Sequence, residues 1–296
     1  MGEGLAALTH GMRIGVVFPQ TELGGDPSAV RAYGQRVEEL RFTHLLAYDH
    51  VVGADPAVYK DWAGPYDIST TFHEPLVMFG YLAAVTTTLE LVTGIIILPQ
   101  RQTVLVAKQA AEVDLLSEGR LRLGVGLGWN AVEYEALGED FGNRGKRMSE
   151  QIDVMRRLWT EQSVTFEGKH HRVTGAGLAP LPVQRPIPVW IGAASKPAFE
   201  RAGRLADGWF PMMSPGPELD EACDIVAQSA TAAGRDPVAM EGRVTWRGDR
   251  DQLAEEIAAW RAAGATHVTV NTMRAGLRTV DEHLDVLAAV AEDLPA

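Results

Sequence analysis

An aspartate–histidine pair, Asp49-His50, directly follows a short apolar run at residues 44–48. Histidine titrates near neutral pH and can donate or accept a proton, so His50 is a candidate general acid–base residue with Asp49 beside it. A histidine at the end of a strand also often makes only a structural hydrogen bond. The pair is therefore a candidate catalytic site, and the structural interpretation stays open beside it.

Glycines at alternate positions form a second candidate site. From Leu121 to Gly128, four aliphatic residues alternate with Arg122 and three glycines. Successive side chains on a strand point to opposite faces, so the three glycines share one face. Glycine leaves space for a flat ring and lets backbone approach a ligand closely, although it would serve equally to relieve crowding between packed strands.

The segment 189–196 (VWIGAASK) predicts a strand that opens into a helix. Small residues and a serine at a helix start expose backbone N–H groups, and the helix dipole favours an anion there. The segment is therefore a candidate phosphate-binding loop, made of Gly192, Ala193, Ala194 and Ser195. An ordinary helix cap at Ser195 is the alternative.

The motifs of several other enzyme classes are missing from the sequence. The segment 124–130 (GVGLGWN) lacks the third glycine of a dinucleotide-binding fingerprint. No G-x-S-x-G motif of a serine hydrolase occurs. His170-His171 lack the spacing of a metal site, so no metal is expected. The single cysteine, Cys223, lies in a helix-like stretch and is expected to pack rather than react.

Charge and composition narrow the choice of partners. The chain has 27 Lys and Arg against 39 Asp and Glu, a formal net charge of −12. Nucleic-acid binding needs clustered basic residues, and adsorption to anionic lipid needs the same, so neither partner is expected. The N-terminus lacks the pattern of a signal peptide. We expect a cytoplasmic protein with a flexible tail at residues 1–11 and one domain at residues 12–296.

Short apolar runs alternate along the chain with amphipathic helical patterns. The eight predicted strands are 13–18, 44–48, 90–98, 121–127, 188–192, 208–211, 242–246 and 266–271. Helical stripes recur at steps of three and four, for example over 30–40, 148–159 and 280–294. Gly203 and Gly264 are predicted to end helices. Eight strands each followed by a helix predict an α/β fold, a (β/α)₈ barrel.

Reactive groups of such a barrel lie at the C-terminal ends of its strands. This rule selects the segments already described and adds Phe18 to Gln20 and Thr93 to Ile95. Two insertions depart from the plain barrel: a long loop at 49–72 after the second strand, and a hairpin at 163–172 with a Pro-rich stretch at 180–188 before the fifth. Long loops after barrel strands are usually functional.

These motifs, taken in order, resemble the bacterial luciferase-like monooxygenase superfamily. The similarity is greatest to its branch that depends on the deazaflavin coenzyme F420, which is common in actinobacteria. The resemblance runs from about residue 13 to residue 209 and is strongest over 73–162. The segments RGKRMSEQIDVMRRLW and PVWIGAASKPAFERAGRLADGW are also typical. The resemblance implies a homodimer, and it separates F420 from FMN less decisively than it identifies the superfamily.

The resemblance implies a role for each matching position. Asp49 and His50 border the deazaflavin ring. At Gly94-Ile95, after Thr93, family members carry a non-prolyl cis peptide that supports the ring. The end of the fourth strand touches the ring and ribityl chain through Leu127, Gly128, Trp129 and Asn130. The loop from Gly192 to Ser195 binds the phosphate.

The implied function is hydride transfer between F420 and a small organic substrate, with His50 as the acid–base residue. The alternative is an FMN-dependent monooxygenase of the same fold that uses reduced flavin and O₂, and a cofactor-binding protein without turnover is a third candidate. The expected substrate pocket consists of Phe18, Gln20, Trp62 and Tyr66, with core packing as the alternative for Trp62. Some relatives carry a proton-donating Glu where this chain has Trp129, which argues against sugar-phosphate oxidation by the same residues.

Overall fold

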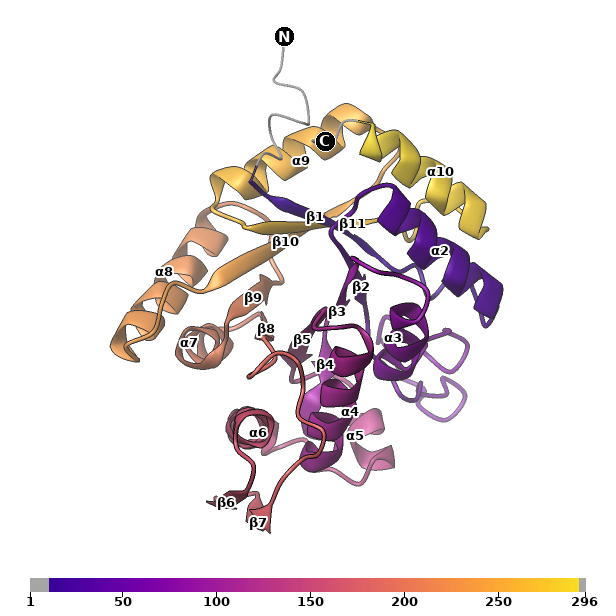
Figure 1. Ribbon diagram of the computed structural model, residues 1–296. Helices are drawn as coiled ribbons and strands as arrows, with labels where there is room; N and C mark the ends of the chain where they lie inside the picture. Colours follow the sequence, from indigo (N-terminus) through magenta and orange to yellow (C-terminus); the bar gives the residue numbers. More distant parts are fainter. Residues whose placement is uncertain (1–10, 293–296) are drawn as a thin grey trace.

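The computed structural model describes residues 11–292, in which eight parallel strand positions close into a barrel surrounded by helices (Figure 1). The sheet runs in the order β3-β2-β1-β11-β10-β9-β8-β5-β4, and pairing of β3 with β5 closes it. The predicted (β/α)₈ barrel is confirmed. The tail expected at residues 1–11 lies, except for Gly11, outside the described residues, as do residues 293–296.

The strands of the barrel agree closely with the predicted runs. They are β1 (Arg13–Val17), β2 (His44–Ala47), β3 (Glu90–Thr93), β4 (Ile96–Ile97), β5 (Leu121–Gly126), β8 (Val189–Ala193), β9 (Gly208–Pro211), β10 (Ala239–Thr245) and β11 (His267–Asn271). The run predicted at 90–98 is divided, because the chain bulges at Gly94 and Ile95 between β3 and β4. β10 begins three residues earlier than predicted, because Ala239 and Met240 pair with β9.

The helices cover the outside of the barrel. They are α2 (Pro27–Glu39), α3 (Pro75–Ala83), η1 (Leu98–Gln100), α4 (Thr103–Leu116), α5 (Ala131–Ala136), α6 (Arg144–Thr160), α7 (Lys196–Leu205), α8 (Pro217–Ala232), α9 (Arg250–Ala262) and α10 (Val280–Ala291). The predicted end at Gly264 is confirmed, with a left-handed φ of 87° just after α9. The predicted end at Gly203 is wrong: it lies inside α7, where a Cβ would stand 2.3 Å from the Val226 carbonyl of α8. Gly203 is therefore a packing residue.

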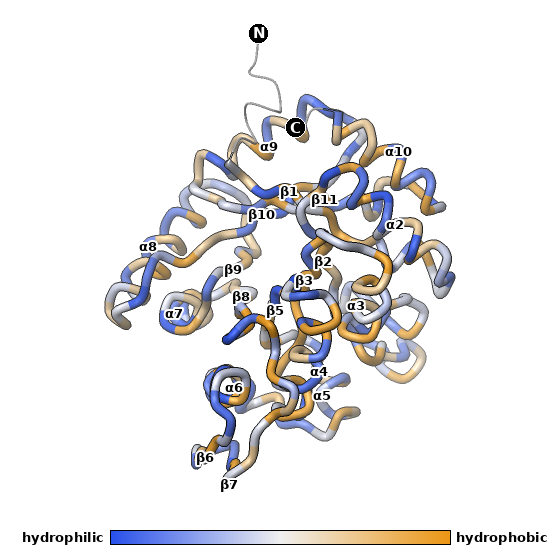
Figure 2. The backbone as a smooth tube through the Cα atoms, in the orientation of Figure 1, coloured by the Kyte–Doolittle hydropathy of each residue, from blue (hydrophilic) through white to orange (hydrophobic). Residues whose placement is uncertain are grey.

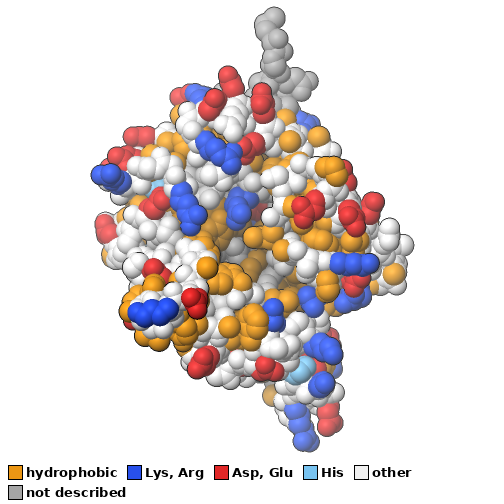
Figure 3. Space-filling model, turned by 180° about the vertical axis from the view of Figure 1, so that it is seen from behind, with side chains coloured by type: hydrophobic (Ala, Val, Ile, Leu, Met, Phe, Trp, Pro, Cys, Tyr) orange, Lys and Arg blue, Asp and Glu red, His pale blue; other side chains and the backbone are white. Residues whose placement is uncertain are grey.

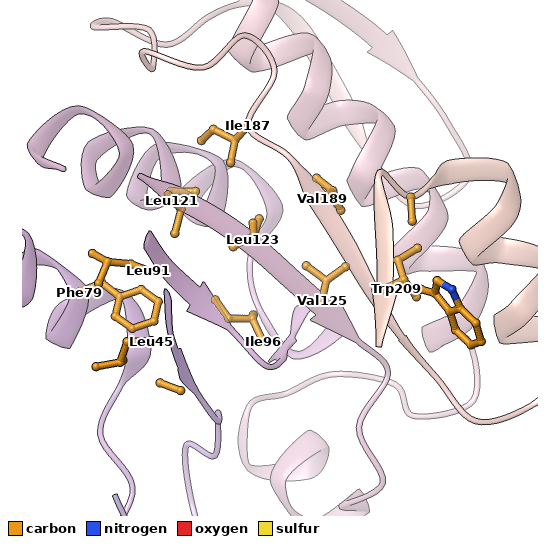
Figure 4. Packing of buried hydrophobic residues seen from close by; sticks show 14 of the residues in the cluster. Leu45, Phe79, Leu91, Ile96, Leu121, Leu123, Val125, Ile187, Val189 and Trp209 are labelled. Atoms are coloured by element: carbon orange, nitrogen blue, oxygen red, sulfur yellow. The ribbon is translucent and has the colours of Figure 1, made fainter. Parts of the chain in front are cut away.

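The main apolar core lies between the barrel and its helices. Apolar residues concentrate on the strands and on the inner helix faces (Figure 2). Figure 4 shows alternate residues of β5, namely Leu121, Leu123 and Val125, pointing into this layer with Val189 and Trp209 of neighbouring strands. Because side chains alternate along a strand, the residues between them face the interior of the barrel.

The interior of the barrel is filled in layers. A separate apolar cluster contains Val17, Leu46, Val92, Trp190, Phe210 and Met273. Below it, at the N-terminal ends of the strands, lies a buried polar network. The Arg122 guanidinium donates to the carboxylate of Glu241, and Nε2 of His44 lies 3.1 Å from the same carboxylate. The barrel is thus closed at its base, and its open end is the C-terminal one.

The hairpin predicted at 163–172 is present, but its second strand extends to Ala176, four residues beyond the predicted end. The strands β6 (Val164–Glu167) and β7 (Arg172–Ala176) pair antiparallel as the expected hairpin. Cys223 lies on α8, with its sulfur 3.9 Å from that of Met240, consistent with packing. Within residues 11–292, no helix is long and apolar enough to cross a membrane.

The buried base of the barrel predicts how stability depends on pH. Burial, assisted by the charge of Arg122, lowers the pKa of His267 from 6.5 to about 3. Between these values the unfolded chain binds a proton that the folded chain does not, so stability falls as pH falls through this window. The slope from one such group approaches about 1.4 kcal/mol per pH unit.

We expect His267→Asn to have a shallower loss of stability on acidification than the unchanged protein. Denaturant unfolding at several pH values from about 7 to about 4 measures the slope, which the linkage relation converts to protons bound. Equal slopes in the two proteins would show that His267 is not the titrating group.

Candidate active site

The C-terminal end of the barrel opens into a cavity of about 670 Å³. The loop after β2 and helix α5 lie on this side, at the back of Figure 1, and Figure 3 shows this face hollowed at its centre. Seventeen residues line the cavity: Thr21, Tyr48, Asp49, His50, Pro65, Tyr66, Gly94, Ile95, Ile97, Gly128, Trp129, Met212, Arg243, Thr245, Asn271, Met273 and Arg274. They come from both walls of the barrel and from the long loop.

The bulge between β3 and β4 forms part of the cavity wall. The Gly94–Ile95 peptide bond is cis, which confirms the expectation drawn from the resemblance. The Ile95 side chain lies between two glycines: a Cβ on Gly126 would stand 2.6 Å from Ile95 Cδ1, and one on Gly192 would stand 3.3 Å from Ile95 Cγ2. Ile95 also packs on the inner apolar cluster. The bulge is therefore a fixed apolar platform exposed to the cavity.

The glycines of β5 make room for this bulge. A Cβ on Gly124 would stand 1.9 Å from the carbonyl oxygen of Thr93, and one on Gly128, at φ 65°, would stand 2.7 Å from Ile97. The expected glycine face is present, but the space beside Gly124 and Gly126 is taken by protein atoms of the third strand. These two glycines therefore act by admitting the platform.

Asp49 is buried, and its carboxylate hydrogen-bonds to residues that follow the bulge. Its carboxylate accepts a hydrogen bond from the Ile97 amide at 3.0 Å and one from Arg101 at 2.8 Å. Burial raises the pKa of Asp49, against the opposing effect of Arg101. The carboxylate thus ties the end of β2 to the residues that follow the bulge, which is a positioning role.

His50 lies at the edge of the cavity with its ring among aromatic side chains. The centroids of Phe72, Tyr66 and Trp129 are 4.8, 5.0 and 5.7 Å away. Its Nδ1 lies 3.3 Å from the carboxylate of Glu133. Among residues 11–292, Nε2 makes no hydrogen bond, so it is the ring nitrogen free to exchange a proton with a ligand.

Glu133 organises this side of the cavity, and sequence reasoning missed it. Its carboxylate accepts hydrogen bonds from the amides of Val51 and Val52 and from Gln100 Nε2, besides facing His50. Burial acts to raise the pKa of Glu133, but these hydrogen bonds and His50 outweigh it and hold the pKa below its ordinary value. The carboxylate fixes the start of the long loop and the orientation of the histidine.

A signal for Glu133 was present in the sequence. Asn130 caps α5 through its side chain, which accepts from the amides of Val132 and Glu133. An Asn followed three residues later by Glu is a recognisable helix start. Its position just after a barrel strand places Glu133 at the end of the barrel where reactive groups lie.

The long loop supplies aromatic walls. The Trp62 indole donates to the Tyr66 carbonyl at 3.0 Å, and its ring packs against Trp129 at 5.6 Å. Tyr66 and Trp129 line the cavity, whereas Trp62 supports them from behind. Trp129 is 42% exposed, which is large for an indole.

Several predicted residues lie outside the cavity. Phe18 is fully buried and packs on Tyr33, so it belongs to the core. Gln20 is buried and donates to the Tyr48 carbonyl at 2.9 Å, a supporting role. Thr93 is buried, and its hydroxyl donates to the Gly124 carbonyl. Leu127 packs partly against the main core.

The predicted phosphate loop borders the cavity rather than lining it. Gly192 contacts the platform, as described, whereas Ala194 and Ser195 are exposed beyond it. Ser195 stands at the N-cap of α7, and its side chain makes no capping hydrogen bond. The Ser195 hydroxyl is therefore open to a ligand, whereas Pro197 has no N–H and the amides of Ala198 and Phe199 donate to the Ser195 carbonyl.

The cavity wall at the ends of β10 and β11, across from the platform, was not predicted from the sequence. Arg243, Thr245, Asn271 and Arg274 line the cavity although no motif singled them out. Only the barrel rule, applied to the last residues of β10 and β11, could have selected them. No group of three metal-ligating side chains occurs within residues 11–292.

Replacing Glu133 tests its organising role. Glu133→Ala leaves two loop amides and Gln100 without their acceptor, so we expect a loss of about 3 kcal/mol in the free energy of unfolding and faster proteolysis within residues 49–72. Denaturant unfolding and limited proteolysis measure these effects. Glu135→Ala on the exposed face of α5 is the matched control, with an expected change within about 0.5 kcal/mol. Equal behaviour of the two variants would contradict the role assigned to Glu133.

Comparisons with known proteins agree with this fold. Residues 12–291 match the family model described as luciferase-like monooxygenase. An uncharacterized protein of Mycobacterium tuberculosis is 32% identical over 262 residues, 87% of this chain and 90% of that protein. An F420-dependent glucose-6-phosphate dehydrogenase of Nocardia farcinica is 30% identical over 259 residues, 83% of this chain and 75% of the relative.

A solved structure shows the same architecture at lower identity. The coenzyme F420 dependent tetrahydromethanopterin reductase from Methanopyrus kandleri superposes with a TM-score of 0.76 at 16% identity, covering 96% of this chain and 98% of the other. This likeness shows the fold alone. The match over residues 12–291 decides the family: the chain belongs to the luciferase-like monooxygenases.

Proposed function

We propose that this protein is an F420-dependent oxidoreductase that transfers a hydride between the deazaflavin and a small organic substrate. The observation that carries the proposal is the apolar platform of Gly94 and Ile95, which lines the cavity at the mouth of the barrel and packs against Gly126 and Gly192. The F420-dependent relative, at 30% identity over most of this chain, supports the choice of deazaflavin.

The residues present fit a flat tricyclic ring. Gly94 and Ile95 offer an apolar surface on one side, and Tyr66 of the long loop and Trp129 after β5 also line the cavity. The exposed Ser195 end of α7 would take the phosphate, because helix N-termini attract anions. When bound, F420 supplies the hydride acceptor or donor, and the protein supplies orientation and proton transfer.

His50 is the residue that would move the proton. Its Nδ1 faces the Glu133 carboxylate at 3.3 Å, which favours the tautomer with hydrogen on Nδ1 and leaves Nε2 as the basic atom. A carbonyl gains a proton on its oxygen as it is reduced, and an alcohol loses that proton as it is oxidised. Trp129 has no acidic proton to offer, and we assign this task to His50, which lines the cavity and whose Nε2 makes no hydrogen bond within residues 11–292.

Cofactor titration tests the proposal directly. We expect purified protein to bind F420 and quench its fluorescence in a saturable manner, with weaker binding of FMN. The same titration identifies the alternative, since saturable FMN binding without F420 binding would reject an F420 enzyme in favour of a flavin monooxygenase. Oxidation of reduced F420 by a panel of enones, ketones and imines then measures turnover.

A second test separates the proton relay from a structural histidine. His50→Ala should lower kcat by about 10²–10⁴-fold while F420 affinity stays unchanged, because general acid–base catalysis contributes in that range. His73→Ala is a control at a histidine that, among residues 11–292, hydrogen-bonds the Gly24 carbonyl alone and does not line the cavity. Unchanged kcat in His50→Ala would refute the relay, and joint loss of F420 affinity would assign His50 to binding.

A further inference from the structure

One wall of the cavity consists of hydrogen-bond donors and lies away from the platform. Arg243, Thr245 and Asn271 come from β10 and β11, and Arg274 follows β11. Thr245 and Asn271 are register partners on these neighbouring strands. Arg243 and Thr245 are two residues apart, so their side chains share the inner face. The fold therefore places two guanidinium groups, an amide and a hydroxyl on one side of the mouth.

The order of the strands puts this wall across the barrel from the platform. Passing round the ring from β3, the positions are β2, β1, β11, β10, β9, β8 and β5. Of eight positions, β10 is four away from β3, and β11 is four away from β5. A molecule on the platform therefore faces Arg243 and Arg274 across the opening. Figure 3 shows Lys and Arg side chains on the rim of the hollow.

Arg243 has no acidic partner among the described residues. Its guanidinium donates to the Tyr48 hydroxyl at 3.2 Å and lies 6.0 Å from the centre of that ring. The nearest carboxylate along its strand face, Glu241, is already engaged by Arg122 and His44. The charge of Arg243 is therefore left for a ligand.

Arg274 is held in place through its backbone. Its φ of 65° is left-handed, and its amide donates to the Glu22 carboxylate at 2.7 Å. The other oxygen of Glu22 lies 3.2 Å from Nε2 of His283 without a hydrogen bond, and burial lowers the pKa of His283 to about 4, so this imidazole is neutral near pH 7. Within residues 11–292 the Arg274 guanidinium makes no ion pair or hydrogen bond.

No carboxylate in the cavity offsets these charges. The single acidic residue that lines it, Asp49, is committed to Arg101 and to the Ile97 amide. Asn271 uses its side-chain oxygen to accept from the Met273 amide, which leaves its NH₂ group as the part open to a ligand. In a chain of net charge −12, such a cationic mouth focuses anions toward the site.

We propose that the substrate is an organic anion whose carboxylate or phosphate ester binds to Arg243, Asn271 and Arg274. Apolar side chains also line the cavity, among them Ile95, Met212 (61% exposed) and Met273. The substrate is thus amphiphilic: its oxyanion lies at β10–β11 and its reacting carbon lies over the platform. The reacting end rests on the proposed hydride transfer, whereas the anion site stands independently of it.

The phosphate of the cofactor is expected at the loop after β8, away from the two arginines. The candidate phosphate loop follows β8, three strand positions from β11, and lies outside the cavity lined by the arginines. Loss of the arginines should therefore spare F420 affinity, and this separates a substrate site from a cofactor site.

Anion binding to the full-length protein without cofactor tests the proposal. The probes are succinate and inorganic phosphate, with succinamide as the neutral analogue, at low ionic strength to limit screening. We expect saturable binding by calorimetry, accompanied by a change in tryptophan fluorescence because Trp129 lines the cavity. In the double variant Arg243→Gln/Arg274→Gln the affinity should fall at least about tenfold. Tighter succinate binding indicates a carboxylate substrate, and tighter phosphate binding indicates a phosphate ester.

Arg278→Gln is the matched control, since Arg278 is exposed in the same loop but does not line the cavity. Thermal unfolding confirms that each variant is folded. The proposal is overturned by absence of saturable anion binding to the unchanged protein, or by equal affinity in the double variant. It is also overturned if the double variant loses F420 affinity, since the arginines would then bind the cofactor. A protein that binds the anions but not F420 would lose the proposed function and keep this site.

Discussion

The ion pair between Arg122 and Glu241 joins two non-adjacent strands, β5 and β10, through the inside of the barrel. Burying these charges is costly unless each is paired and hydrogen-bonded. Here His44 and Thr269 complete the shell of Glu241, and Arg122 also lies 4.3 Å over the Trp190 ring. Burial acts to raise the pKa of Glu241, but Arg122 and His44 hold it far below its ordinary value. The base of the barrel is thereby filled and fixed.

With the base closed by charge and the middle by an apolar layer, the C-terminal end is where the interior opens. Its shape follows from small residues on one side. Gly124 and Gly126 let the third strand bulge inward, and the bulge presents Ile95 to the cavity. Asp49 then holds the chain after the bulge through the Ile97 amide. The platform is thus the consequence of packing on three neighbouring strands.

Most of the barrel could be predicted because it depends on local patterns. An apolar run indicates every strand of the barrel. The break in the strand predicted at residues 90–98 comes from a bulge, which hydrophobic periodicity does not detect. Gly203 was misread because its reason is contact with α8, which is distant in sequence. The family resemblance predicted the cis bond at Gly94–Ile95, which no propensity argument could supply.

The site could be predicted only in part, because local motifs can be recognised in the sequence whereas contacts between distant residues cannot. Motifs indicate the residues near β2, β3 and β5. Glu133 carries only the signal of a helix start and Arg243 carries no motif, so the role of each becomes clear only when the barrel brings them to one opening. Asp49 and His50 are neighbours in the sequence but have different partners in the structure: the carboxylate accepts from Arg101, and the imidazole lies beside Glu133.

The contrast between Glu241 and Arg243 shows how one strand serves both stability and recognition. They are two residues apart on the same face of β10, yet every interaction of Glu241 is internal and its charge is fully paired. Arg243 stands one layer higher, at the solvent-filled mouth, where an unpaired guanidinium keeps its hydration and costs little. A substrate oxyanion would displace that water and supply the missing charge. The buried Glu241 carboxylate needs its ion pair, whereas the exposed Arg243 guanidinium can remain unpaired. Both arrangements are favourable because β10 runs from the buried base of the barrel to its exposed mouth.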